Sequence, residues 1–229
     1  MNKGLKITLS IVLLALIVYL VYAIVGSIME PVNFNKQKDI RSAVAVQRLK
    51  DIRTLEVAYK GVTGHYTADV DSLILFYNTG KMDIIMQVGS NDDSLAVVNT
   101  EKLKKQNRKI TPQEMYERYL KGENLVFSIK NSIPVKDTLF HSRTDFVADS
   151  LKYIPFSGKM PVETDAIVKT VSGVQVPLFE AKMPYRALLK GLDNQLRINL
   201  DADCRASNRY EGLQFGSVTA PNNNAGNWE

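Results

Sequence analysis

The chain has 229 residues, of which 45% are hydrophobic and 23% charged, so its composition is that of a folded protein and excludes general disorder. It carries 29 Lys and Arg against 24 Asp and Glu, a net charge of +5 that is too balanced to indicate nucleic-acid binding. Its single cysteine, Cys204, excludes an intramolecular disulfide. With only His65 and His141 beside it, a standard zinc site is not expected.

Residues 7–28 form an uncharged apolar run, ITLSIVLLALIVYLVYAIVGSI, which follows a basic tail at residues 1–6. At 1.5 Å per residue the run spans about 33 Å as a helix, enough for a hydrocarbon core of about 30 Å. We therefore predict a transmembrane helix over 7–28. A cleaved signal peptide is the alternative, although its apolar region is usually about 7 to 15 residues long.

Membrane orientation is predicted from the basic residues that flank the run. They are Lys3 and Lys6 before it, and Lys36, Lys38, Arg41 and Arg48 after it. Their count favours a cytoplasmic body, but long domains translocate largely regardless of charge, whereas a short basic tail stays inside. We expect the tail in the cytoplasm and the body in the periplasm, with the span in the inner membrane.

A second, amphipathic helix is expected over residues 32–62. Pro31 should end or kink the span, and Asn33 or Asn35 can cap the restart. Apolar residues at helical spacing then mark one face, which we call the apolar stripe. The stripe consists of Ala45, Leu49, Ile52, Leu55, Tyr59 and Val62. Two interpretations stay open: the stripe packs against partner helices, or against the chain's own domain.

The stretch GVTGHYTADVDSLILF predicts a turn from this helix into a head. Glycine adopts left-handed backbone angles cheaply, and Asp69 or Asp71 can cap a short helix that follows. The residues expected to set this helix-to-head turn are Gly61, Gly64, Tyr66 and Leu73.

These residues also resemble a known family. The pattern Asp51-Ile52, Ala58-Tyr59, Gly64-His65-Tyr66-Thr67 and Asp71-Ser72-Leu73 is similar to that of type IV pilins and the pseudopilins of type II secretion. The resemblance covers about a third of the chain and implies an apolar helix continuing into an amphipathic one. It departs at the prepilin peptidase site, where this chain has Lys6-Ile7-Thr8-Leu9-Ser10.

The whole chain, including its ending at residues 222–229, also resembles a group of single-pass envelope proteins of Gram-negative anaerobes. That resemblance implies a place in the cell envelope and no particular activity.

The remaining sequence predicts an α+β head over residues 63–220, with an antiparallel sheet and short helices. Strands are expected at 81–88, 124–140, 162–171, 173–180, 185–190 and 213–218, and helices at 94–109, after Thr111, near 146–154 and from Asp193 to about Ser207. In the helix after Thr111, we expect Met115, Tyr119 and Leu120 to face inward. The tail at 221–229 is expected to be polar and loosely held, with Trp228 docking on the body.

No motif for catalysis stands out, since the sequence has no glycine-rich phosphate loop and no Gly-x-Ser-x-Gly turn. Helix caps explain the pairs Asp69/Asp71 and Asp92/Asp93 better than calcium binding does. We therefore expect no enzyme, no cofactor and no metal.

The expected function is that of a membrane-anchored structural or interaction protein, pilin-like or an accessory subunit of an envelope secretion or pilus-like apparatus. The first alternative is a bitopic assembly platform or binding module that does not polymerise, which the missing peptidase site favours. The second is a membrane-anchored enzyme, without motif support. The expected partners are the lipid bilayer and envelope proteins, including copies of the chain itself. Nucleic acid is not expected, and no small-molecule substrate is evident.

Overall fold

The computed structural model describes residues 3–229, without the side chains of Lys3 and residues 5–8. Met1 and Asn2, part of the expected basic tail, lie outside the described residues.

The chain divides into two compact units, unit 1 (Met1–Thr54 with Ser150–Glu229) and unit 2 (Leu55–Asp149). The sequence predicted one head over 63–220, whereas the structure forms two units. The fold class is confirmed as α+β, with a long apolar N-terminal helix, two antiparallel sheets and short helices.

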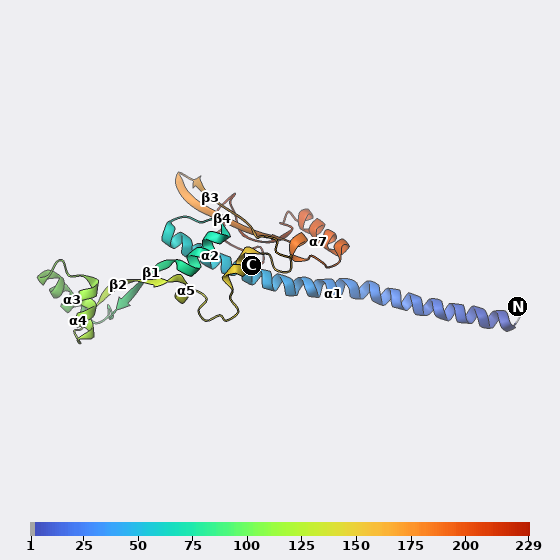
Figure 1. Cartoon of the computed structure of the whole chain (residues 1–229), viewed down its shortest axis with the longest axis horizontal. Helices are drawn as coiled ribbons and strands as arrows, with labels where there is room; N and C mark the ends of the chain where they lie inside the picture. The colour runs from blue at the N-terminus through green and yellow to red at the C-terminus, as the bar shows by residue number, and fades with distance from the viewer. Residues whose placement is uncertain (1–2) are drawn as a thin grey trace. The chain divides into compact units, whose positions relative to one another are not determined.

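Helix α1 (Lys3–Thr63) is a single helix of 61 residues that contains Pro31. Of the predicted end or kink at Pro31, the end is therefore wrong, and the helix does not begin again at Asn33 or Asn35, as the uninterrupted ribbon in Figure 1 shows. One proline removes one backbone hydrogen bond at a cost of about 3 kcal/mol, and helix-forming sequence on both sides outweighs this local loss. The apolar run and the amphipathic segment consequently share one axis.

Unit 1 contains a three-stranded antiparallel sheet in the order β3-β4-β5. Its strands are β3 (Glu163–Val171), β4 (Val174–Pro184) and β5 (Gly212–Gly216). The predicted hairpin is confirmed: Ser172 and Gly173 both have positive φ, 51° and 82°, as a type I′ turn requires. Phe179 and Phe215 meet in the core with ring centroids 5.5 Å apart.

Three helical segments complete unit 1. The short η1 (Ala148–Lys152) precedes the sheet, and α6 (Tyr185–Leu188) and α7 (Asn194–Ala206) connect β4 to β5. Asp193 caps α7 as predicted, accepting a hydrogen bond from the Leu196 N–H at 2.7 Å. The strand predicted at 185–190 is wrong. Consecutive residues 187–189 are all buried there, which one helical turn allows and a strand with two faces does not.

The C-terminal tail is held against β5 instead of being loose. Gly226 forms a bridge with Phe215, and the Asn227 N–H donates to the Gln214 carbonyl at 3.0 Å. Trp228 covers Gly226, where a Cβ atom would lie 2.4 Å from the indole ring. The expected docking of Trp228 on the chain's own body is thus confirmed, because main-chain pairing with β5 fixes the residues around it.

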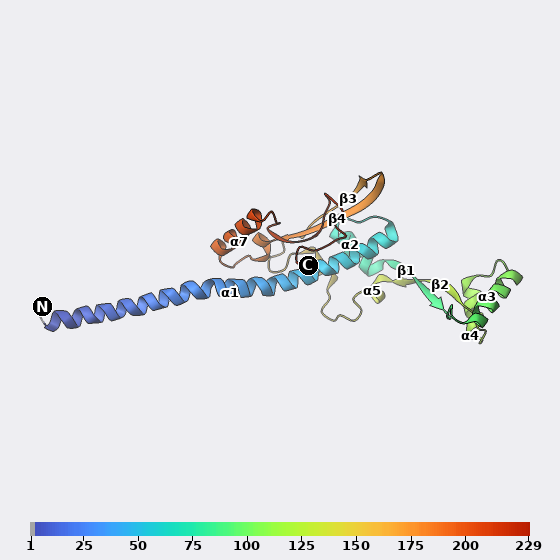
Figure 2. The same cartoon turned by 180° about the vertical axis from the view of Figure 1, so that it is seen from behind.

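Unit 2 begins with the last turns of α1 and carries a two-stranded antiparallel sheet of β1 (Lys81–Val88) and β2 (Phe127–Pro134). Its helices are α2 (Val70–Thr79), α3 (Ser94–Gln106), α4 (Pro112–Leu120) and α5 (Val135–Thr138). Figure 2 shows α3 and α4 gathered at one end of the β1–β2 ribbon. A buried cluster joins them there, formed by Val88, Leu103, Met115, Leu125, Phe127 and Ile129.

Helix α4 has the predicted capping box, in which Thr111 and Glu114 each bond the other's backbone N–H. Met115 is buried as expected. Tyr119 and Leu120 are 38% and 67% exposed, so the prediction that they face inward is wrong. The nine-residue helix packs on the cluster by its first turns, and Tyr116 and Ile110 supply the remaining contacts.

Candidate functional site

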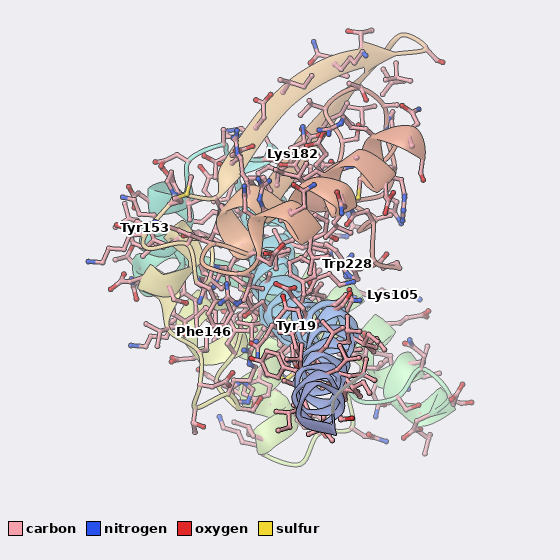
Figure 3. The ribbon with its side chains drawn as sticks, turned by 90° about the vertical axis from the view of Figure 1, so that its right-hand side faces the viewer. Tyr19, Lys105, Phe146, Tyr153, Lys182 and Trp228 are labelled. Carbon is pink, nitrogen blue, oxygen red and sulfur yellow. The ribbon has the colours of Figure 1, made fainter. Side chains whose placement is uncertain are left out.

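The N-terminal half of α1 exposes an uninterrupted apolar surface. Every large apolar side chain from Leu9 to Val32 is at least 48% exposed. Figure 3 looks along this helix and shows Tyr19 standing out from it. By length and composition the helix can cross a membrane, and none of its apolar window is buried. The chain therefore has the form of a single-pass membrane protein, a form that a signal sequence near the N-terminus would share.

The apolar stripe is used within the chain. Ala45, Leu49, Ile52 and Leu55 are all 0% exposed, and Tyr59 is half-buried. Only Val62, at 51%, is open to solvent. The expectation that this stripe packs against partner helices is therefore corrected: four of its six side chains have no surface left for another chain, because the body already covers them.

Two arginines on α1 donate hydrogen bonds to backbone carbonyls elsewhere in unit 1. The Arg41 guanidinium donates to the carbonyls of Leu188 (3.2 Å) and Lys190 (2.9 Å). The Arg48 guanidinium donates to the Tyr153 carbonyl at 2.5 Å. Charged donors of this kind make strong hydrogen bonds, so they fix α1 to the rest of unit 1.

The residues predicted to set the helix-to-head turn take different roles. Gly64 ends α1 with φ +84°, and its N–H donates to the Lys60 carbonyl at 2.8 Å. Gly61 lies inside the helix, exposed and without close neighbours for a Cβ atom. Leu73 is fully buried, and the Tyr66 ring lies 4.8 Å from the Lys60 ammonium. Gly64, Tyr66 and Leu73 thus stand at the turn, whereas Gly61 does not.

The aspartates near this turn and before α3 act as helix caps. Asp69 accepts hydrogen bonds from the N–H groups of Asp71 and Ser72, each at 3.1 Å. Asp93 accepts from Leu95 and Ala96 at 2.9 and 3.2 Å. Their oxygens stabilise the first turns of α2 and α3, which is the role the sequence favoured over calcium binding.

Glu56 is a buried carboxyl in unit 2 that the sequence did not single out. It is 1% exposed, and its Oε2 accepts a hydrogen bond from the Thr67 N–H at 3.2 Å. Its Oε1 is buried without a partner among the described residues. Burial raises the pKa of Glu56 to about 8, against the opposing effect of the Thr67 hydrogen bond. The only signal in the sequence was its position beside Leu55 on the buried side of the helix.

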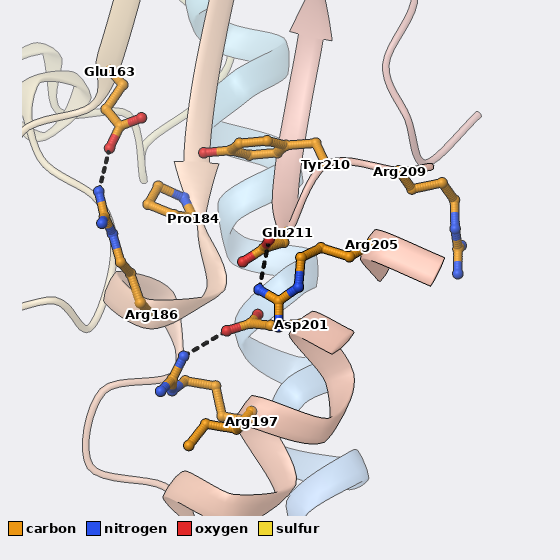
Figure 4. A pocket seen from close by; sticks show the side chains of 10 residues that line it. Glu163, Pro184, Arg186, Arg197, Asp201, Arg205, Arg209, Tyr210 and Glu211 are labelled. Atoms are coloured by element: carbon orange, nitrogen blue, oxygen red, sulfur yellow. Dashed lines mark hydrogen bonds and ion pairs between the residues drawn. The ribbon is translucent and has the colours of Figure 1, made fainter. Parts of the chain in front are cut away.

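A cavity of about 680 Å³ opens in unit 1. Three ion pairs lie along its wall, as Figure 4 shows. These pairs are Arg186–Glu163 (3.2 Å), Arg197–Asp201 (2.5 Å) and Arg205–Glu211 (2.8 Å). Arg209 also lines the cavity, and its guanidinium has no hydrogen bond or ion pair within the described part of the chain.

Asp201 is the most buried of these charged groups, at 6% exposed. Its Oδ2 binds Arg197, whereas its Oδ1 is buried and has no hydrogen-bond partner among the described residues. Burial raises the pKa of this carboxyl, and the nearby Arg197 opposes the shift. The cavity wall is therefore not fully satisfied by the chain's own groups.

The sequence did not reveal this cavity. The four-residue spacing of Arg197, Asp201 and Arg205 places them on one face of α7 and was a readable local signal. Arg186 and Glu163 come from other elements and join them only in the folded unit. No pattern within one segment could show that convergence.

Comparison of the chain with models of protein families, with curated proteins and with solved structures found no match. Function is therefore inferred from the geometry and chemistry of the chain itself.

Proposed function

We propose that this protein is a membrane-anchored interaction protein of the cell envelope, in which α1 crosses the inner membrane once and carries a body in the periplasm. This proposal rests on the uninterrupted exposure of apolar side chains from Leu9 to Val32. About fourteen Leu, Ile and Val residues in this run contribute on the order of −4 to −8 kcal/mol to membrane insertion.

A rigid connection between anchor and body supports a platform role. Helix α1 continues without a break from the apolar run into its packed half, and Arg41 and Arg48 bind it to carbonyls of unit 1. Unit 1 is consequently held at a fixed height above the bilayer, which suits a protein that presents a surface to other envelope proteins. We favour a platform that does not polymerise, because the apolar stripe is already covered.

A pilin-like subunit is the second candidate. The observation that favours it is the single continuous helix with a free apolar half and a packed amphipathic half, the arrangement that the resemblance implies. In this candidate, copies of the chain associate through the exposed apolar half of α1 and assemble into a polymer.

Two arginines in the apolar run should abolish anchoring. The double variant Leu13→Arg/Ile17→Arg adds about 2.5 to 3.5 kcal/mol per arginine to the insertion free energy, which offsets most of the gain from the run. We expect the wild-type chain to stay in the membrane pellet after alkaline carbonate extraction, and the variant to appear in the supernatant. The double variant Ile40→Arg/Val44→Arg, at exposed positions of the same helix, is the control and should stay in the pellet. Release of the wild-type chain into the supernatant would contradict the proposal that α1 anchors it in the membrane.

Cross-linking from the apolar helix separates the two candidate functions. Cys204 is buried and the only cysteine, so Cys204→Ser with Leu16→Cys and Val18→Cys provides two reactive thiols per chain, on nearly opposite exposed faces of α1. With a bismaleimide in native membranes, the platform predicts no regular ladder of self-adducts. A ladder of dimers, trimers and longer species would instead establish the pilin-like candidate.

The chain without its native cysteine (Cys204→Ser) also allows the orientation of the body across the membrane to be measured. A thiol at the exposed Leu75 position (Leu75→Cys) should react with a membrane-impermeant maleimide in intact cells if the body is periplasmic. Labelling only after lysis would place the body in the cytoplasm.

A further inference from the structure

The cavity in unit 1 that Arg186, Arg197, Arg205 and Arg209 line has the size and lining of a small-ligand site. Its volume of about 680 Å³ falls within the range of about 300 to 1,000 Å³ typical of such sites. Four guanidinium groups line it against three carboxylates, which leaves one positive charge in excess. All of these groups belong to unit 1.

The arginines have hydrogen-bond donors to spare. A guanidinium carries five N–H donors. Arg186 and Arg205 each use one nitrogen for a carboxylate, and Arg209 uses none within the described residues. The side chains of Arg186 and Arg205 are 68% and 57% exposed. Exposed ion pairs contribute about 0 to 1 kcal/mol, so a ligand of higher charge can take over these donors at little cost.

Other groups on the wall fit the remainder of a ligand. Burial raises the pKa of the Tyr210 phenol, so that it stays a neutral O–H donor, and this hydroxyl has no hydrogen-bond partner in the described chain. In Figure 4 the Tyr210 ring lies across the cavity, with Pro184 near its hydroxyl end. The ring, Pro184 and Ile198 offer apolar surface for an organic part.

A phosphate satisfies this arrangement better than a carboxylate. A phosphate monoester carries about −1.5 to −2 charges near pH 7 and three strong acceptor oxygens, whereas a carboxylate has one charge and two oxygens. Arginine forks suit such oxygens because they donate in parallel pairs.

We propose that this cavity is a binding site for a small phosphate monoester, held by Arg186, Arg205 and Arg209. The phosphate could be that of a soluble metabolite or that of a lipid headgroup such as phosphatidic acid. The second source is within reach because the loop that leads into α7, Gly191–Asp193, lines a pocket with Met29 and Glu30 of α1, just beyond the predicted span. The shared chemistry is the monoester, and the experiment separates the sources.

The test titrates glycerol 3-phosphate into the full chain in neutral detergent. Trp228 is the only tryptophan and lines a pocket together with Arg209 and Tyr210, so its fluorescence reports on this wall, and calorimetry gives an independent reading. We expect saturable binding, and a half-saturation concentration at least about tenfold higher in Arg205→Ala/Arg209→Ala. The control Arg108→Ala/Arg118→Ala removes the same charge from unit 2 and should bind as the wild type does.

Folding of the variants is checked by circular dichroism. If Arg205→Ala/Arg209→Ala does not fold, Arg205→Lys/Arg209→Lys retains the charge and removes the fork, and it should still bind more weakly than the wild type. No saturable binding by the wild-type chain, or an equal loss in the unit 2 control, would overturn the proposal.

Dioctanoyl phosphatidic acid is titrated in parallel, with dioctanoyl phosphatidylcholine as the comparison. Tighter binding of the phosphatidic acid than of glycerol 3-phosphate, lost in the same arginine variant, assigns the site to a lipid headgroup. Equal binding assigns it to a soluble phosphate. Equal binding of the two lipids, unaffected by the arginine variant, would contradict recognition of the monoester.

Discussion

Replacement of Ile52 by aspartate is expected to destabilise unit 1 strongly. Ile52 is 0% exposed on α1, so the substitution removes about 1.5 to 3 kcal/mol of apolar burial and places a carboxylate where it lacks water. The combined loss exceeds about 4 kcal/mol, a large fraction of the 5 to 15 kcal/mol that stabilise a typical domain. Denaturant unfolding of the detergent-solubilised chain, followed by Trp228 fluorescence, measures it.

Ile40→Asp is the matched control, because it makes the same chemical change on the same helix at a position that is 49% exposed. We expect it to change the free energy of unfolding by less than about 1 kcal/mol. If Ile52→Asp instead folds normally and loses only its cross-linked complexes, the apolar stripe is a partner surface after all.

Local chemistry explains which elements the sequence predicted well. Strand β1 begins and ends where the sequence placed it, at Lys81 and Val88. Asp193 and Thr111 begin helices because their side-chain oxygens accept N–H groups of the first turn. The Ser172-Gly173 turn sets the β3–β4 register. Each of these signals acts over a few neighbouring residues and can be read without the fold.

The features that escaped prediction depend on distant contacts. Whether α1 ends at Pro31 is decided by long stretches of helix on either side, and whether residues 185–190 form a strand is decided by their burial against the rest of unit 1. The tail is ordered because Gly226 pairs with Phe215, eleven positions earlier in the chain. The guanidinium groups of the cavity come from α6, α7 and the segment before β5.

Glu56 makes the stability of unit 2 depend on pH. Its pKa is about 8 in the folded chain, against an ordinary value of 4.5. Below pH 4.5 the Glu56 carboxyl is mostly protonated in both the folded and the unfolded chain, so it does not lower the free energy of unfolding. As the pH rises from 4.5 to about 8, the unfolded chain loses this proton first, so the free energy of unfolding falls, and above about pH 8 the loss is complete. A shift of this size corresponds to on the order of 4 kcal/mol.

The variant Glu56→Gln has no proton to lose and keeps an oxygen for the Thr67 N–H, so its stability should be flat where that of the wild type falls. Urea unfolding followed by circular dichroism between pH 5 and pH 9 should show the two curves close together near pH 5 and diverging toward alkaline pH. Over this range the wild type should lose on the order of 2 kcal/mol or more of unfolding free energy relative to the variant. The exposed Glu101 on α3 gives the control: Glu101→Gln should retain the wild-type slope. An unchanged slope in Glu56→Gln would mean that Glu56 is already ionised at neutral pH in the folded chain, and that unit 2 opens enough at this turn to hydrate it.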